Sequence, residues 1–290
     1  MLERQKPFPL PMVNPVPEYR ATSQLKNVYE ETKTSLQVPW MGVVTMAFAH
    51  YPTFFDTLWR GIEKLVGSEE FVKSCFDLRN LTESQVLILS PTSLNSSLIQ
   101  MGYDQEEIRE IIKLNEVFSH GNMPYLMIAT AARLLLEGYE LSDATNIERY
   151  KGKHGPSHTK PLVLMEAHHA SPSTLALYED IKSKLGLPII NTDYRAFARW
   201  PTYFGMAWDD LSHKLVSAKY EQQVCNVHDF AVGQMLKLPN PSGLTCKILQ
   251  EAAQADASLH EVKEVVRLFQ WLLPGLALNV AYFRAQLLKV

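Results

Sequence analysis

Apolar residues recur along this chain at the three- and four-residue spacing of amphipathic helices. The pattern begins after an arm, residues 1–20, whose five prolines exclude a regular helix, and Thr22 or Ser23 can cap the first helix. Further helices are predicted over residues 60–77, 83–98, 104–119 and 123–137, with counterparts in the second half of the chain. No hairpin turn dipeptide stands between alternating strands, so we expect an all-α protein.

Proline positions mark several helix boundaries in this pattern. Pro172 follows Ser171 and stands at the favoured first-turn position of a helix. Pro52 and Pro201 each follow an apolar stretch, and each is predicted to end one helix and begin the next.

The helical pattern occurs twice. Residues 28–59 align without a gap on residues 177–208, with 12 of the 32 positions identical, and a second register pairs 110–122 with 264–276. A self-match at a period of roughly 150 residues has the length of a domain and is too long for a solenoid unit. We therefore expect two tandem homologous helical repeats that form an intramolecular pseudo-dimer.

The domain division follows from the repeat and from one polar segment. Residues 149–161 (RYKGKHGPSHTKP) are rich in Gly and Pro and lack periodicity, which is typical of a linker. We expect an N-terminal helical repeat with its Pro-rich arm over 1–140, a linker over 141–165 and a C-terminal helical repeat over 166–290.

Composition argues against several functional classes. The net charge is −3 and no basic stripe is present, so no nucleic-acid partner is expected. The N-terminal segment lacks the apolar core of an export signal, which favours a cytoplasmic protein. The apolar segment 268–283 is short for a membrane span and is interpreted as a buried helix, so no membrane partner is expected. Three cysteines without a CxxC motif indicate reduced thiols.

Other candidate groups carry less weight. Four histidines lie in or near the linker without a supporting Cys or carboxylate cluster, and a solvated loop is the simpler interpretation: His154, His158, His168 and His169. Arg195 and Arg199 could attract an anionic substrate or pair with nearby acids. No glycine-rich phosphate loop or dinucleotide fingerprint is present in the sequence.

Asp193 follows the apolar segment LGLPII at 185–190. A carboxylate among buried neighbours is costly unless it is paired, caps a helix or serves a function. Taken alone, the segment favours a cap, in which Asp193 or Thr192 precedes a helix beginning at Tyr194. The repeat weakens this alternative because the matching position in the first half is Val44, so the fold does not require an acid there.

Asn122 is the second polar residue that one half has and the other lacks. The order Gly121-Asn122 shortly before Pro124 is, by itself, typical of a turn without chemistry. The matching pair in the second half is Gly275-Leu276, so the glycine is repeated and the asparagine is not. We interpret the glycine as structural and Asn122 as a candidate functional group. One active site could thus be shared by two former subunits.

Three motifs resemble those of a known family: VPW at 38–40, HGNMPYL at 120–126 and NTDYRAFARWP at 191–201. Their order and spacing in a duplicated helical chain resemble the group I 2-haloacid dehalogenases, the family of DL- and D-2-haloacid dehalogenases. The resemblance covers essentially the whole chain. It implies hydrolytic dehalogenation of short 2-haloalkanoic acids to 2-hydroxy acids.

The resemblance also implies residue roles. In that family an aspartate activates a water with help from an asparagine, and the matching residues are Asp193 and Asn122. Trp40 matches the family's pocket tryptophan, Thr192 a hydroxyl residue beside the base, and Phe269 a pocket aromatic. These residue types suit the reaction, because a carboxylate can deprotonate a water that an amide orients. Direct attack on the α-carbon would invert configuration and needs neither metal nor cofactor.

Substrate orientation and pocket size depend on four further positions. The substrate carboxylate is expected at the backbone N–H groups near Thr192 and Tyr194, where the helix dipole favours an anion. The family usually has a bulky aromatic where this chain has Val43. Members that accept both enantiomers have a small residue two positions before the aspartate, and the larger Asn191 favours D-2-haloacids.

Alternative functions stay open at this level. Asp193 could attack carbon itself and form an ester that water then hydrolyses. A helical antioxidant protein would need a redox CxxC, which the sequence lacks. A duplicated helical module could bind a small organic acid without turning it over. The expected partner is a small-molecule 2-haloacid, and the resemblance suggests a homodimer.

Overall fold

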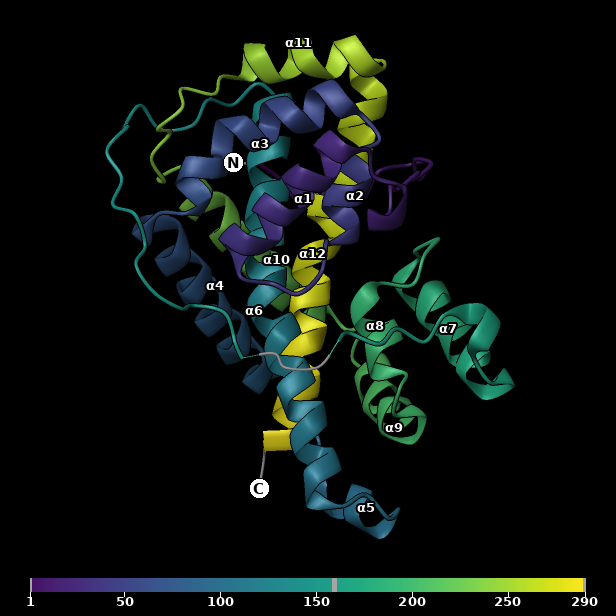
Figure 1. Cartoon of the computed structure of the whole chain (residues 1–290). Coiled ribbons are helices and arrows are strands. Elements are labelled where there is room, and N and C mark those ends of the chain that lie inside the picture. The colour runs from purple at the N-terminus through teal and green to yellow at the C-terminus, as the bar shows by residue number, and fades with distance from the viewer. Residues whose placement is uncertain (1, 158–160, 289–290) are drawn as a thin grey trace.

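The computed structural model describes residues 2–157 and 161–288, and within these ranges it is all-helical, as predicted (Figure 1). Two short 3-10 helices, η1 (Glu18–Arg20) and η2 (Ala167–His169), accompany the α-helices. The α-helices are α1 (Ser23–Leu36), α2 (Val43–Phe48), α3 (Pro52–Val66), α4 (Glu69–Ile88), α5 (Asn95–Gln100), α6 (Gln105–Leu136), α7 (Pro172–Leu185), α8 (Thr192–Phe197), α9 (Pro201–Ser212), α10 (Ala218–Met235), α11 (Cys246–Asp256) and α12 (Leu259–Leu288).

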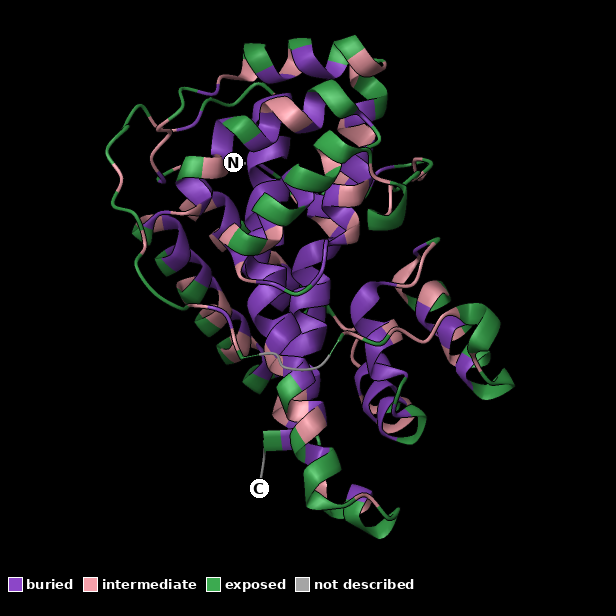
Figure 2. Cartoon of the chain, viewed as in Figure 1, coloured by how far each residue is buried: buried purple, intermediate pink, exposed green. Residues whose placement is uncertain are grey.

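Two long helices, α6 and α12, run side by side through the centre of the molecule (Figure 1). Both are buried along most of their length, which Figure 2 shows as the purple centre of the fold. Among the described helices only α12 is long and apolar enough to cross a membrane, and 89% of its most apolar stretch is buried inside the protein. Helices that are apolar on all sides occupy the core of a large helical fold, and α12 fits that position.

The predicted break between 104–119 and 123–137 is wrong. Residues 105–136 form one continuous helix, and the expected turn at Gly121-Asn122 is helical backbone with Pro124 inside it. A proline within a helix removes one backbone hydrogen bond and crowds the preceding turn. Here burial of α6 on all sides outweighs that cost, since tertiary packing commonly overrides local propensity.

Two other predicted spans cross a real boundary. The span 60–77 contains the end of α3 and the start of α4, because the Ser68 hydroxyl caps α4 by accepting from the Phe71 N–H. The span 83–98 contains the end of α4 at Ile88 and the start of α5. Apolar spacing continues through both boundaries, so periodicity alone does not reveal them.

Local signals placed most other boundaries correctly. Thr22 and Ser171 cap α1 and α7 through their side chains, and Pro52 and Pro201 occupy the first position of their helices. Side-chain caps of this kind satisfy N–H groups that have no partner within the helix. The Pro-rich arm is extended up to η1 and packs on the body, where Leu2 is buried.

Helices of one half pack against helices of the other. The six α-helices of residues 23–136 and the six of residues 172–288 follow one another in similar lengths, with α1 matching α7 and α6 matching α12. The pairs α3–α11, α4–α10 and α4–α12 are all in contact. Residues 143–157 and 161–166 contain no α-helix and lie between the two sets of helices, and positions 158–160, including His158, lie outside the described residues. The two halves therefore interlock.

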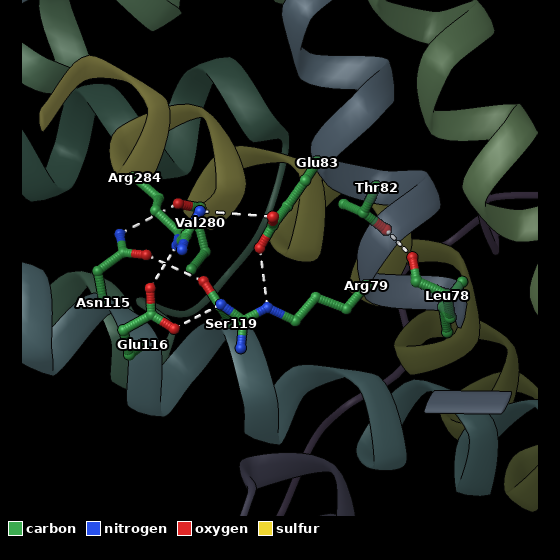
Figure 3. A network of polar contacts seen from close by, with 9 residues as sticks. All are labelled: Leu78, Arg79, Thr82, Glu83, Asn115, Glu116, Ser119, Val280 and Arg284. Carbon is green, nitrogen blue, oxygen red and sulfur yellow. Dashed lines mark hydrogen bonds and ion pairs between the residues drawn. The ribbon is translucent and has the colours of Figure 1, made fainter. Parts of the chain in front are cut away.

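An ion-pair network fixes α6 against α4 and α12 (Figure 3). The carboxylate of Glu116 lies 2.5 Å from Arg79 of α4 and 2.5 Å from Arg284 of α12. Beside it, the amide of Asn115 donates to a backbone carbonyl of α12 at 3.1 Å. These contacts hold α6 in place less than two turns before Asn122.

Candidate active site

Asn122 and Asp193, 71 residues apart in sequence, are in direct contact. The Nδ2 of Asn122 donates a hydrogen bond of 2.7 Å to Oδ1 of Asp193. Each residue is only 3% exposed. Asn122 comes from the middle of the central helix α6 and Asp193 from the first turn of the short helix α8. The structure thus brings together the two polar groups at which the repeats differ.

Helix α8 positions Asp193 inside its first turn. The capping residue is Asn191, whose side chain makes no cap hydrogen bond, and Thr192 is the first helical residue. The alternative in which Asp193 or Thr192 serves as the N-cap is therefore wrong. A carboxylate in the first turn still gains from the helix dipole, which is positive at that end.

Burial dominates the electrostatics of Asp193. Removal from water raises the pKa of its carboxyl from 3.8 to about 6, while the hydrogen bond from Asn122 and the charge of Arg195 pull the pKa downward. Both nearby arginines are paired: Arg195 lies 2.7 Å from Glu166, and Arg199 lies 3.9 Å from Glu110. The acid is thus poised to change protonation near neutral pH, as a general base requires.

A small cavity of about 20 Å³ opens onto this pair. That is room for about one water molecule. Five of the predicted pocket residues line it together with Asp193 and Asn122: Trp40, Val43, Asn191, Thr192 and Phe269. The other lining residues are Gly42, Val44, Tyr125, Leu272, Leu273 and Leu276. Its polar residues are Asp193, the two asparagines, Thr192 and Tyr125, and the remaining lining residues are mostly apolar.

Tyr194 does not place its side chain in this pocket. Its hydroxyl accepts a hydrogen bond of 2.9 Å from Nδ2 of Asn279, and its ring packs among aromatics such as Phe204 and Phe283. The expected role of Tyr194 therefore rests on its backbone N–H alone, at the start of α8.

Close packing holds Trp40 over the pocket. A Cβ added at Gly121 would stand 2.3 Å from the Trp40 ring, so only glycine allows the indole this position. Tyr125 donates from its hydroxyl to the Trp40 carbonyl at 2.6 Å, and the Trp40 and Phe118 ring centroids are 5.0 Å apart. Gly121 thus serves helix–indole packing and not a turn.

Sequence reasoning missed several wall residues. Tyr125 stands within the HGNMPYL motif, so the motif could have suggested it. Val44 and Leu276 were noted only as the apolar counterparts of Asp193 and Asn122, yet both line the same pocket. Val44 aligns with Asp193 and Leu276 aligns with Asn122 in the sequence, so the alignment itself could have suggested them.

Within the described ranges, no group of three or more His, Cys, Asp or Glu side chains is arranged to hold a metal ion. The lining residues carry one acid, two amides and two hydroxyls among aromatic and aliphatic side chains. Their arrangement can bind and polarise a small molecule through hydrogen bonds and can accept one proton.

Comparisons with known proteins identify the family. The family model described as "Halocarboxylic acid dehydrogenase DehI" matches residues 39–194, which include Asn122 and Asp193. The (R)-2-haloacid dehalogenase of Rhizobium sp. (strain NHG3) is 42% identical over 84% of this chain and 95% of that protein. The (R)-2-haloacid dehalogenase of Pseudomonas putida is 34% identical over 99% of this chain and 97% of that protein.

A solved structure of a D-2-haloacid dehalogenase with L-LA has a TM-score of 0.88 at 32% identity, over 99% of this chain and 100% of that chain. Both the fold and the sequence therefore place the chain among the 2-haloacid dehalogenases. The chain belongs to the DehI family, and the resemblance drawn from its motifs is confirmed.

Proposed function

We propose that this protein is a hydrolase that converts short 2-haloalkanoic acids to 2-hydroxy acids. The hydrogen bond between Asn122 and Asp193, closed inside an apolar pocket, is the observation that carries the proposal. The relatives named (R)-2-haloacid dehalogenases support the substrate class.

Asp193 acts as the general base and Asn122 as the group that orients it. A water bound between the carboxylate and the substrate loses a proton to Asp193, and its oxygen attacks the α-carbon. The carbon–halogen bond breaks as the carbon–oxygen bond forms, and the halide leaves with the bonding electrons. Attack from the face opposite the halide inverts the configuration. The space of about 20 Å³ beside the pair accommodates such a water.

The substrate carboxylate is placed at the first turns of α2 and α8. Gly42 and Asn191 occupy the matching cap positions of these helices, and both residues line the pocket. The first N–H groups of a helix lack partners within it and favour an anion. Trp40 and Phe269 then exclude bulk water and surround the alkyl and halogen groups.

Asn191 sets the preference for the D enantiomer. Its buried side chain occupies pocket wall beside Thr192 and Asp193, where it blocks one of the two substrate orientations. Val43, which is smaller than an aromatic residue, leaves space in the same pocket. The product from a D substrate is then the L-2-hydroxy acid.

The architecture originates from a duplication. The boundaries 1–140, 141–165 and 166–290 separate the two copies, and the matching order of α1–α6 and α7–α12 supports them. Each copy has retained one polar group, Asn122 or Asp193, where the other is apolar. The assembled enzyme is a homodimer of such chains.

The decisive experiment measures halide release from D- and L-2-chloropropionate. Asp193→Asn is expected to lower kcat by roughly 1,000-fold or more, the range of lost general-base catalysis. Asn122→Ala is expected to lower kcat by roughly 100-fold or more because it removes one pre-organised hydrogen bond at the reacting groups. Exposed Asp209→Asn serves as the matched control with unchanged activity.

Isotope labelling tests the mechanism separately. A single turnover in heavy-oxygen water is expected to place the label only in the hydroxy acid. Label in the Asp193 carboxyl would show that Asp193 attacks carbon itself. Absence of halide from both enantiomers, with retained binding of the acids, would leave a binding module in place of an enzyme.

A further inference from the structure

A second cavity lies directly beside the pocket of Asp193. It measures about 130 Å³ and shares three lining residues with that pocket, Asn191, Leu272 and Leu276. Arg4 of the N-terminal arm forms part of its far wall. The two spaces therefore share part of one wall, so the larger cavity offers a route by which a small molecule can reach Asp193.

The far wall presents a nearly buried cation. The Arg4 side chain is 9% exposed, and its guanidinium lies 5.0 Å from the centre of the Trp271 ring. Arg4 also donates from Nε to the Trp271 carbonyl at 3.2 Å and pairs with Glu221. The side chain of Glu221 is 56% exposed, so this carboxylate marks the solvent side of the cavity.

The glycine that lines this cavity has surroundings different from those of its aligned counterpart. In the first half Trp40 fills the space over Gly121, and the aligned residues in the second half are Ile189 and Gly275. A Cβ added at Gly275 would meet nothing nearer than the hydroxyl of Tyr220, at 3.5 Å. The indole of Trp40 thus covers Gly121, whereas Gly275 lines the open cavity.

Hydrogen bonds hold the wall of the cavity in place. Asn279 stands where the first half has Tyr125. Tyr220 donates to Oδ1 of Asn279 at 2.8 Å, and Asn279 donates to the Tyr194 hydroxyl at 2.9 Å. The polar side chains of Tyr220, Asn279 and Tyr194 are thus hydrogen-bonded to one another in the wall of the cavity.

We propose that this cavity is an access chamber that binds the anionic 2-haloacid before reaction, with Arg4 as the group that captures the carboxylate. The inference rests on the proposed function. The incoming carboxylate replaces Glu221 as the partner of Arg4, because a guanidinium pairs equally well with either carboxylate. Movement of the shared wall, Asn191, Leu272 and Leu276, then admits the substrate to Asp193.

Neutralising Arg4 and neutralising Glu221 are expected to change kcat/KM in opposite directions. Arg4→Gln is expected to lower kcat/KM for D-2-chloropropionate about tenfold and to leave the single-turnover rate at saturating substrate unchanged, and Arg4→Lys restores part of the loss. Glu221→Gln frees Arg4 and is expected to raise kcat/KM. If Arg4 only anchors the arm, both Arg4→Gln and Glu221→Gln lower kcat/KM, which would overturn the proposal. Surface Arg109→Gln is the matched control.

A larger side chain inside the chamber tests the access route independently of charge. Gly275→Met places a flexible side chain inside the chamber, whereas Gly205→Met projects into open space on α9. The first variant is expected to lower kcat/KM at least tenfold with the single-turnover rate preserved, and the second to match wild type. Equal kcat/KM in all three proteins would overturn the access route.

Binding separates failure of the chamber from failure of the proposed function. In the Asp193→Asn protein, stopped-flow fluorescence with D-2-chloropropionate measures association without turnover. Slower association after Arg4→Gln supports the chamber whether or not the wild type releases halide. Association at an unchanged rate refutes the chamber alone, and no association in any protein refutes both.

Discussion

The buried carboxyl of Asp193 predicts that its neutral replacement stabilises the protein. The pKa of this group rises from 3.8 to about 6 because burial disfavours the charged form. At about 1.4 kcal/mol for each pKa unit, keeping Asp193 ionised in the folded protein costs about 3 kcal/mol. Asp193→Asn removes that charge and keeps an oxygen that accepts from Asn122. We therefore expect the variant to be more stable at pH 8.

The contribution of Asp193 to the stability of the folded protein depends on pH. A carboxyl whose folded pKa is raised binds more protons in the folded state, so stability falls as pH rises from about 4 through 6. Well below pH 3.8 the group is neutral in both states and the advantage of Asp193→Asn disappears, and at pH 4 most of that advantage is already lost. At pH 8 the full difference of about 3 kcal/mol is present, or roughly 5 to 10 °C in Tm for a chain of this size.

The assay is thermal or denaturant unfolding of wild type and Asp193→Asn at pH 4 and pH 8. The stability gain of Asp193→Asn over wild type is compared between pH 8 and pH 4. Any packing change that the substitution introduces is the same at both pH values and cancels in this comparison. Asp209→Asn, at an exposed position, controls for general charge effects. An equal gain at both pH values, or no gain at pH 8, would refute the assignment of a buried and costly ionised acid.

Three further outcomes follow from the site and its supports. First, kcat/KM should rise with pH through about 6 and level off above it, because Asp193 must be ionised to accept a proton; a pH–rate profile flat from 5 to 8 contradicts this. Second, Gly121→Ala should displace Trp40, lower the free energy of unfolding by about 1–3 kcal/mol and lower kcat. Unfolding and halide release measure these effects, and a variant with the stability and activity of wild type would contradict the close packing. Third, Glu116→Gln should lower the free energy of unfolding by about 1–2 kcal/mol by weakening the partly buried pairs with Arg79 and Arg284; an unchanged free energy in denaturant unfolding would contradict this.

Local signals in the sequence placed most of the helices. The prolines at 52, 172 and 201 fix φ and lack an N–H, so their meaning at a helix start is independent of context. Pro124, in contrast, lies inside a continuous helix where a break was predicted. Burial of α6 on all sides offsets the cost of this proline, and such burial depends on segments distant in the sequence. Capping by Ser68 likewise depends on where the chain turns in space.

The candidate site was reached through the differences between the two halves. Asn122 and Asp193 stood out because their counterparts are apolar, and the structure places them 2.7 Å apart. Tyr125 and Leu272 were not predicted, because wall residues carry no chemical signature and are selected only by the crossing of α6, α8 and α12. Tyr194 was near in sequence, yet helix geometry turns its ring away from the acid.

The interlocking of the two halves has a consequence for synthesis on the ribosome. Helices α3, α4 and α6 emerge first, yet α10, α11 and α12 cover them only after the rest of the chain has been made. At about 5–20 residues per second, the apolar faces of the nascent first half wait roughly 10–30 s for their partners. A chaperone that shields this first half during translation would therefore raise the yield of native enzyme.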